Sequence, residues 1–321
     1  MTQRTLAEWL DWQQTAHPRP IDLGLERLAN VLDRLEWRGF RCPVVTVGGT
    51  NGKGSCVAFL EAILSASGRR VGVFTSPHLV RYNERIRVDG QELADAAIVA
   101  AFERIEAARG SQTLTFFEYN ALAAFLLFED AEVDAVVLEV GLGGRLDAVN
   151  VVAADAAVVT SIGLDHCEWL GSDLQSIGRE KAGIFRSGRP AIFGARQRPT
   201  SIDTEAQRIG ASLWRLGDEF DYVVDGDCWR WNGPGVVLAD LPRPALHGTT
   251  QYANAAAAIA ALVGLRHRLP VSEEVIRSGL RNVRLPGRFQ VIEGPVEWIL
   301  DVAHNPDGAG TLAQHLAERP A

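Results

Sequence analysis

Residues 43–64 read PVVTVGGTNGKGSCVAFLEAIL, and this stretch decides the fold. Its β-branched start over 43–47 predicts a buried strand, and apolar residues over 56–64 recur at helical spacing. Between them, residues 48–55 form a glycine-rich turn from strand to helix. Such a turn gathers backbone N–H groups around a phosphate, and Lys53 adds a mobile positive charge. The stretch therefore predicts a phosphate-binding loop.

This loop departs from the standard GxxxxGK[ST] pattern in two ways. The first glycine of that pattern falls at Val47, and Gly54 separates Lys53 from Ser55. A glycine-rich turn without a ligand is therefore the alternative. The Gly-Lys pair between a strand and a helix favours phosphate binding by Gly52, Lys53, Gly54 and Ser55, with the Ser55 hydroxyl on a magnesium ion.

Short β-branched runs alternate with longer helical patterns along the rest of the chain. Strands are predicted over 70–75, 133–140 and 156–162 and from Pro190, and helices over 118–128 and 254–265. The 118–128 helix is apolar nearly all round, which is typical of a buried helix. Within 221–231, Asp225-Gly226 predicts a hairpin. Together these patterns predict an α/β fold, a mostly parallel sheet with helices on both faces.

Polar side chains follow three of the predicted strands. Ser76 follows one, Glu139 lies near the end of another, and Asp165 and His166 follow a third. Because parallel strands end at one edge of their sheet, these side chains and the phosphate loop should converge there. Ser76 and Glu139 suit Mg²⁺, which prefers oxygen ligands. The residues alone leave open a solvated loop histidine at His166 and a solvated acid at Glu139.

The composition narrows the class of protein. The 321 residues carry a net charge of −8 and no Lys/Arg-rich run, which disfavours a nucleic-acid binder. The four cysteines form no CxxC pair, so neither a disulfide scaffold nor a zinc ribbon is predicted. Glu8 and Asp11 interrupt the apolar stretch of a signal peptide, and no run is long enough to span a membrane. A soluble, cytoplasmic protein is expected.

The turn at Leu285-Pro286-Gly287 predicts a domain boundary. Beyond it, strands are predicted over 289–292 and 298–302, followed by the start of a helix. The segment from 287 to 321 is shorter than the usual minimum of about 50 residues for a domain. We therefore expect one domain over 1–286 and a truncated start of a second domain over 287–321.

Eight phrases besides the GTNGKGS loop occur in order along nearly the whole chain. They are IDLGLER (21–27), TSPHLVRYNER (75–85), TFFE (115–118), LEVGLGGRLDA (138–148), DH (165–166), EKAGI (180–184), LPGRFQ (285–290) and DVAHNP (301–306). Together they resemble the folate branch of the Mur-ligase superfamily, and within it the bifunctional dihydrofolate synthases/folylpolyglutamate synthases. The resemblance implies a P-loop domain of the Mur-ligase central-domain type and a Rossmann-like C-terminal domain that opens at Arg288.

The resemblance also implies metal ligands. Family members bind magnesium through the positions of Ser76, Glu139 and His166. Lys181, which on its own would be a surface lysine, is implied to be carbamylated and to bind a second magnesium ion. Carbon dioxide reacts only with a neutral amine, so the pKa of this lysine would have to be lowered. The resemblance also leaves room for a monovalent cation.

For the nucleotide, the resemblance implies that Asn254 contacts the adenine, Arg288 the phosphate and Asp301 the ribose of ATP. The resemblance also implies three catalytic residues, Lys53, Lys181 and His304. Asn254 is alternatively the N-cap of its helix, and Arg288 a solvated hinge charge. Residues 248–251 read GTTQ where many relatives have Gly-x-His-Gln.

A pterin-carrying substrate is implied to contact three segments of the chain. Their residues are Ile21, Asp22, Leu23, Gly24, Thr115, Phe116, Phe117, Glu118, Leu146, Asp147 and Ala148. One of the two phenylalanines would stack on the flat pterin ring, although both are also typical core aromatics. Asp22 and Asp147 are alternatively turn or cap residues.

The implied activity is an ATP-dependent ligation of L-glutamate to dihydropteroate, and to reduced folates, through an acyl phosphate. The expected partners are these small molecules, with no nucleic acid or membrane, and a monomer is expected. Three alternatives stay open: a monofunctional folylpolyglutamate synthase, a catalytically impaired nucleotide- or pterin-binding fragment, and a plain P-loop ATPase. Ligand binding without phosphate release would identify the fragment, and ATP turnover at the full rate without glutamate would identify the ATPase.

Overall fold

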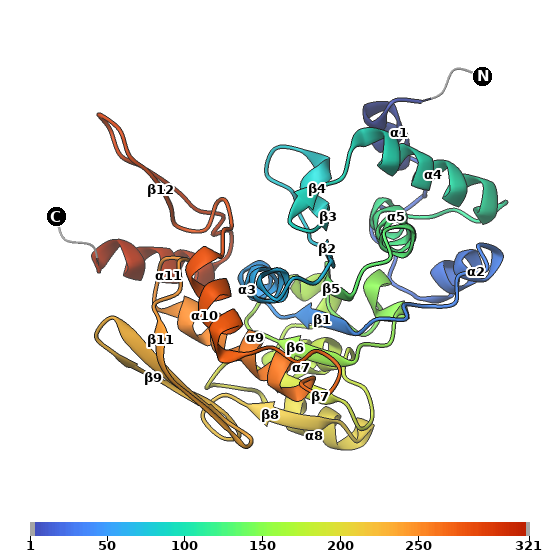
Figure 1. The fold of residues 1–321 in the computed structure, drawn as a ribbon. Helices are drawn as coiled ribbons and strands as arrows, with labels where there is room; N and C mark the ends of the chain where they lie inside the picture. The colour runs from blue at the N-terminus through green and yellow to red at the C-terminus, as the bar shows by residue number, and fades with distance from the viewer. Residues whose placement is uncertain (1–3, 319–321) are drawn as a thin grey trace.

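The computed structural model describes residues 4–318. Its centre is an eight-stranded sheet with the order β4-β3-β2-β5-β1-β6-β7-β8 (Figure 1). These strands are β1 (Val44–Gly48), β2 (Val71–Phe74), β3 (Ile86–Val88), β4 (Gln91–Glu92), β5 (Ala135–Glu139), β6 (Ala156–Val159), β7 (Pro190–Phe193) and β8 (Ser212–Arg215). Neighbouring strands are parallel except in the pairs β2–β3 and β3–β4. The predicted mostly parallel α/β sheet is confirmed.

Helices cover both faces of the sheet, as predicted (Figure 1). One face carries α1 (Leu6–Gln13), α2 (Glu26–Arg34), α4 (Asp95–Arg109), α5 (Phe116–Asp130), α7 (Leu174–Ala182) and α8 (Thr200–Ile209). The other carries α3 (Lys53–Ala66), α9 (Thr250–Gly264) and α10 (Glu273–Asn282). Because side chains alternate along a strand, Val44 of β1 joins the α5 core and Val45 joins the α3 core.

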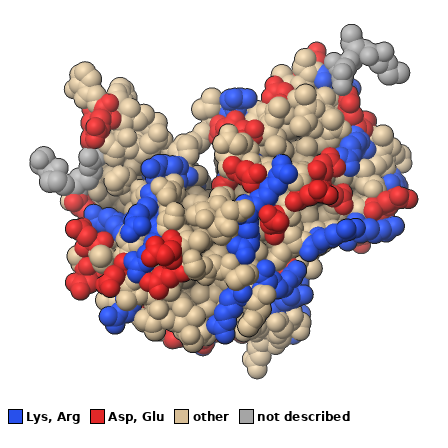
Figure 2. Space-filling view, in the orientation of Figure 1, with Lys and Arg blue, Asp and Glu red and all other residues tan. Residues whose placement is uncertain are grey.

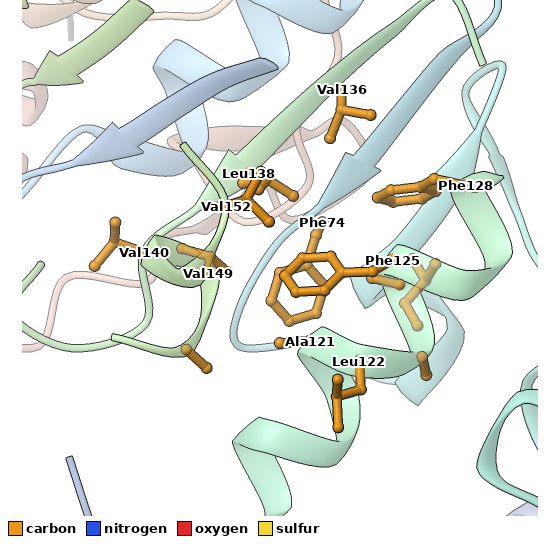
Figure 3. Close-up of a cluster of buried hydrophobic side chains, with 14 of the residues drawn as sticks. Phe74, Ala121, Leu122, Phe125, Phe128, Val136, Leu138, Val140, Val149 and Val152 are labelled. Carbon is orange, nitrogen blue, oxygen red and sulfur yellow. The ribbon is translucent and has the colours of Figure 1, made fainter. Parts of the chain in front are cut away.

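The core on the α5 face is made of aromatic and branched side chains. Figure 3 shows Phe74 of β2 together with Phe125 and Phe128 of α5, beside Val136 and Leu138 of β5. All of these side chains are fully buried. The predicted buried helix over 118–128 is confirmed, since every residue of that range is buried within α5.

A three-stranded antiparallel sheet packs against α9. It consists of β9 (Asp221–Asp225), β10 (Cys228–Gly233) and β11 (Val236–Pro242) in the order β11-β10-β9. The turn between β9 and β10 lies at the predicted Asp225-Gly226 hairpin. Trp231 of β10 is fully buried, and its Nε1 donates to the Ala256 carbonyl oxygen of α9 at 3.1 Å.

The C-terminal segment, residues 287–318, has the two strands and the helix that were predicted. β12 (Gln290–Ile292) pairs antiparallel with β13 (Trp298–Leu300), and α11 (Pro306–Ala317) follows. Figure 1 shows this β-ribbon projecting from the body of the molecule. Trp298 is 61% exposed. The division of the chain into two domains stays a prediction.

Several further elements were not predicted, and the shortest of them carry too few residues for a clear period. β4 has two residues, both exposed, and η1 (Tyr82–Arg85), η2 (Ala148–Val151) and α6 (Cys167–Leu170) are single turns. No helix within residues 4–318 combines the length and apolarity needed to cross a bilayer. On the face drawn in Figure 2, acidic and basic side chains are interspersed.

Candidate active site

The predicted phosphate loop lies where β1 ends and α3 begins. Gly49 and Gly52 have φ angles of 140° and 88°, which L side chains rarely adopt. A Cβ atom at Gly49 would lie 2.0 Å from Thr160 Oγ1, and one at Gly52 would lie 2.5 Å from Asn254 Oδ1. Both positions therefore require glycine, and the loop is confined between the end of β6 and α9.

Residues that follow β6 hold the loop in place. Thr50 N donates to the Ser161 carbonyl oxygen at 2.8 Å, and Asn51 N donates to Ser161 Oγ at 3.1 Å. Thr160 Oγ1 donates to the Asn51 carbonyl oxygen at 2.6 Å. The helix that starts at Lys53 leaves its first N–H groups without internal partners. The fixed loop and the helix N-terminus together favour an anion at this point.

Two lysine side chains meet at the loop. Lys53 Nζ donates to the carbonyl oxygens of Gly49 and Thr50, both at 3.1 Å, and Lys181 Nζ donates to the Gly49 oxygen at 3.0 Å. Burial lowers the pKa of Lys53. Burial, with the Lys53 charge in second place, lowers the pKa of Lys181 to about 7. Lys181 is only 5% exposed, so its interpretation as a surface lysine is wrong.

Lys53 and Lys181 are also the only lysines among the chain's 32 lysine and arginine residues. Arginine stays charged in proteins, whereas a buried lysine readily loses its proton. The chain therefore carries a side-chain primary amine at two positions alone, and both lie in this site. This feature of the composition could have identified Lys181 from the sequence.

A buried carboxylate lies beside the loop. Glu139, at the end of β5, is 4% exposed, so it is not the solvated acid of the alternative interpretation. Its Oε2 accepts a hydrogen bond from Ser76 N at 3.0 Å, the one hydrogen bond this carboxylate accepts from the described residues. Burial raises the pKa of Glu139, while the charge of Lys53 acts against that shift. The carboxylate therefore has lone pairs available for a cation.

The predicted magnesium ligands come together in one cleft of about 630 Å³. Ser76, Glu139, His166 and Lys181 all line it, together with the phosphate loop. His166 caps α6, and its side chain is 49% exposed, which fits both a ligand and a solvated loop residue. Within residues 4–318, no three His, Cys, Asp or Glu side chains are grouped so that they could hold a metal ion. The available donor set is therefore mixed, and it fits a Mg²⁺ ion that keeps waters and phosphate oxygens.

The residues that the resemblance assigns to the nucleotide also lie at this cleft. Asn254, Arg288, Asp301 and His304 all line it, as the resemblance implied. Asn254 lies inside α9, whose N-cap is Thr249, so its interpretation as the N-cap is wrong. Asp301 Oδ2 accepts a hydrogen bond from a backbone N–H at 2.8 Å, which fixes the carboxylate at the end of β13.

Two of these residues are cationic or potentially cationic. Arg288 is half-buried beside the loop, where a Cβ at Gly54 would lie 3.5 Å from its Nη2, and burial lowers its pKa. Its interpretation as a solvated hinge charge is therefore wrong. His304 is 66% exposed, and its Nε2 lies 3.9 Å from Asp165 Oδ2.

The residues assigned to the pterin are not among those that line this cleft. Asp22 and Glu118 are joined by Arg27, whose Nη1 lies 2.9 Å from Asp22 Oδ2 and whose Nε lies 3.0 Å from Glu118 Oε1. His17 Nε2 lies 3.1 Å from the same Asp22 oxygen. Arg27 and His17 were not predicted, although Arg27 lies in the IDLGLER phrase. Asp22 is thus an ion-pair partner rather than a turn residue.

The other two pterin segments adjoin the cleft through Gly141. A Cβ at Gly141 would lie 2.5 Å from Phe117 Cζ, and Phe116 and Phe117 are both half-buried at the margin of the core. Asp147 caps η2 and accepts hydrogen bonds of 2.8–3.0 Å from the backbone N–H groups of Gly141, Leu142 and Val149. Burial outweighs these bonds and raises the pKa of Asp147 to about 6. Its interpretation as a cap residue is confirmed.

The comparisons with known proteins agree with this fold. The model of the Mur ligase middle domain matches residues 47–221. The dihydrofolate synthase/folylpolyglutamate synthase of Escherichia coli K12 is 51% identical over 318 residues, which cover 98% of this chain and 73% of that protein.

Solved structures are equally similar. The structure of E. coli FolC in complex with DHPP and ADP has a TM-score of 0.95 and 50% identity, covering 99% of this chain and 75% of that one. A bifunctional folylpolyglutamate synthase/dihydrofolate synthase with Mn, AMPPNP and L-glutamate bound has a TM-score of 0.90 and 47% identity. The alignment covers 98% of this chain and 75% of that one.

Proposed function

The chain belongs to the dihydrofolate synthase/folylpolyglutamate synthase family of Mur ligases, and from this membership we propose that it uses ATP to join L-glutamate to dihydropteroate and to reduced folates. The observation that carries the proposal is the cleft in which Lys53 and Lys181 meet at the Gly49 carbonyl beside the buried Glu139. The relatives bound to ADP, or to AMPPNP, Mn and L-glutamate, support ATP and a divalent metal as ligands of this cleft.

The reaction has two steps. A carboxylate oxygen of the pteroate or folate attacks the γ-phosphorus of ATP, and the bond to the bridging oxygen breaks to give ADP and an acyl phosphate. The amine of glutamate then attacks the acyl carbon, the amide forms, and inorganic phosphate leaves with the former carboxylate oxygen. Lys53 and the first-turn N–H groups of α3 stabilise the phosphoryl oxygens, where charge accumulates during transfer. His304 faces the same cleft and assists there.

Ser76, Glu139 and His166 would hold the divalent ion, which we propose to be Mg²⁺. An ion bound there would neutralise the negative charge on the phosphate oxygens. The buried Glu139 carboxylate, with its single accepted hydrogen bond, supports this assignment. On the nucleotide, Arg288 binds phosphate, Asp301 binds ribose and Asn254 contacts adenine.

We propose that Lys181 is carbamylated and holds a second Mg²⁺. Its pKa of about 7 leaves a large share of the amine neutral at physiological pH, and that neutral form reacts with carbon dioxide. Incubation with ¹³C-bicarbonate should give a carbamate signal in ¹³C NMR that Lys181→Arg abolishes and that fades below pH 7. Lys53→Arg is the matched control and should keep the signal. A wild-type protein with no carbamate signal would contradict the assignment.

The pterin site is proposed at residues 21–24, 115–118 and 146–148, where Arg27 links Asp22 to Glu118. Residues 1–286 are proposed as the ATP-binding domain and 287–321 as the start of a C-terminal domain. The four free cysteines agree with a reducing cytoplasm, where we place the protein as a monomer.

The decisive experiment measures phosphate release from MgATP with dihydropteroate and L-glutamate, added separately and together. We expect release only with both, and dihydrofolate as the product. Release that needs a reduced folate in place of dihydropteroate would identify a monofunctional folylpolyglutamate synthase. Release at the full rate without glutamate, or ATP binding without any release, would contradict the proposed ligase activity.

A further inference from the structure

Two asparagine side chains join the phosphate loop to the C-terminal segment. Asn51 Nδ2 donates to Asn305 Oδ1 at 3.2 Å, and Asn305 Nδ2 donates to Asn51 Oδ1 at 3.0 Å. Two carboxamides paired in this way each use one donor and one acceptor, a pairing that a carboxylate or a hydroxyl cannot reproduce. We call this pair of side chains the amide latch.

Asn305 makes two further contacts that extend the latch. Its Nδ2 also donates to Asp165 Oδ2 at 3.1 Å, and its Oδ1 accepts from Gly308 N at 2.8 Å as the N-cap of α11. One carboxamide therefore connects the phosphate loop, the residues that follow β6 and the first turn of α11. Four hydrogen bonds therefore orient the Asn305 carboxamide.

The backbone of Asn51 is independently fixed. Its N–H and its carbonyl oxygen are both hydrogen-bonded to the side chains that follow β6, Thr160 and Ser161. The loop thus keeps its shape without the Asn51 side chain, which is directed to the C-terminal segment instead. Nearby, α11 packs closely against the same region, because a Cβ at Gly163 would lie 2.2 Å from Asp307 Oδ2.

We propose that Asn305 is a positioning residue that holds the C-terminal wall of the cleft, with Asp301 and His304, at a fixed distance from the phosphate loop through Asn51. The proposal rests on the proposed function, since it assigns ATP to this cleft. Asn305 does not touch the reacting atoms. It acts by holding the two walls in a fixed relative position, which lowers the entropy that is lost when the nucleotide binds between them.

The test compares the wild type with Asn51→Ala, Asn305→Ser and the double variant. Serine at 305 still caps α11 but is too short to reach Asn51, and Asn51→Ala leaves the cap untouched. Each single substitution should weaken binding of Mg-AMPPNP in calorimetry, and raise KM for ATP, about tenfold. The turnover number should fall less than about threefold, because the groups at the reacting atoms are unchanged. The combined loss of affinity in the double variant should match that of Asn305→Ser instead of reaching about a hundredfold, since both changes break the Asn51–Asn305 contact and Asn305→Ser also removes the donor to Asp165.

Asn282→Ala is the matched control, because among residues 4–318 the Asn282 side chain bonds only to Ser278 within α10. It should leave the affinity for AMPPNP unchanged. The proposal would be wrong if both single variants bound AMPPNP as tightly as the wild type. It would also be wrong if the losses of affinity in the two single variants multiplied in the double variant.

A wild-type protein that fails to bind AMPPNP would refute the proposed function separately. The latch is then tested by hydrogen exchange without nucleotide, at matched melting temperatures. Faster exchange of the amides over 301–311 in both single variants supports it, and unchanged exchange overturns it.

Discussion

The two walls of the cleft are built in different ways. The wall that carries Lys53, Glu139 and Lys181 belongs to the eight-stranded sheet, with a hydrophobic core on each face. The opposite wall is the C-terminal segment, whose two short strands have mostly exposed or half-buried side chains. Trp231 beneath α9 is fully buried, whereas Trp298 of β13 is 61% exposed.

The two walls therefore contribute to the site in different ways. In the sheet wall, burial moves the pKa of Lys53, Lys181 and Glu139 away from their ordinary values. In the C-terminal wall, Asp301 and His304 are exposed, and hydrogen bonds hold their segment in place. Substitutions in the first wall should therefore alter reactivity and stability, and those in the second should alter how the walls meet.

The largest expected effect is on catalysis in the sheet wall. Lys53→Met should lower the turnover number for phosphate release about a thousandfold, because the variant lacks the charge at the phosphoryl oxygens. The measurement is steady-state phosphate release with all substrates present. Arg230→Met, an exposed position on β10, is the control and should keep full activity. Near-normal turnover in Lys53→Met would contradict the proposed role of Lys53 in stabilising the phosphoryl oxygens.

The next effect is on stability. Trp231→Ala should lower the free energy of unfolding by about 4 kcal/mol, since it leaves a large cavity beneath α9. It also leaves the Ala256 carbonyl oxygen without the indole N–H donor. Urea denaturation followed by circular dichroism measures the change. A loss of less than about 1 kcal/mol would mean that the β9–β11 sheet is only loosely attached to α9.

A pH-dependent effect of intermediate size is expected at Asp147. Its pKa in the folded protein is about 6, above its ordinary value of 3.8, so the folded state binds the proton more tightly than the unfolded chain. The resulting stabilisation is present below about pH 4 and is lost as the pH rises through about 6, a change of about 3 kcal/mol.

Asp147→Asn has no titrating group at this position and should lack that loss. The unfolding free energy of the wild type minus that of the variant should therefore fall between pH 4 and pH 6. A constant difference across this range would show that the pKa of Asp147 is not raised.

The smallest effect is expected in the C-terminal wall. Trp298→Ala should change the free energy of unfolding by no more than about 0.5 kcal/mol, because the exposed ring loses little burial. Comparison with Trp231→Ala in the same denaturation assay contrasts the core that backs the sheet wall with the exposed C-terminal segment. A cost similar to that of Trp231→Ala would contradict the contrast between the walls.

Much of this molecule was predictable from local patterns. The glycine-rich turn, the alternation of strands and helices, and the hairpin at Asp225-Gly226 all follow from residues close together in sequence, and the structure confirms them. Convergence at one edge of the sheet was predictable too, since parallel strands end there. The short strands β3 and β4 were missed because their few residues carry no clear period.

The sequence by itself determined the fold class, the phosphate loop and, through its ordered motifs, the family. Only the tertiary structure decided the burial of Lys181, because its surroundings include Gly49, which lies 132 positions away in the sequence. It likewise decided the amide latch, which joins residues 254 positions apart. Local patterns report what a residue can do with its neighbours in sequence, whereas burial and long-range pairing depend on which surfaces the folded chain brings together.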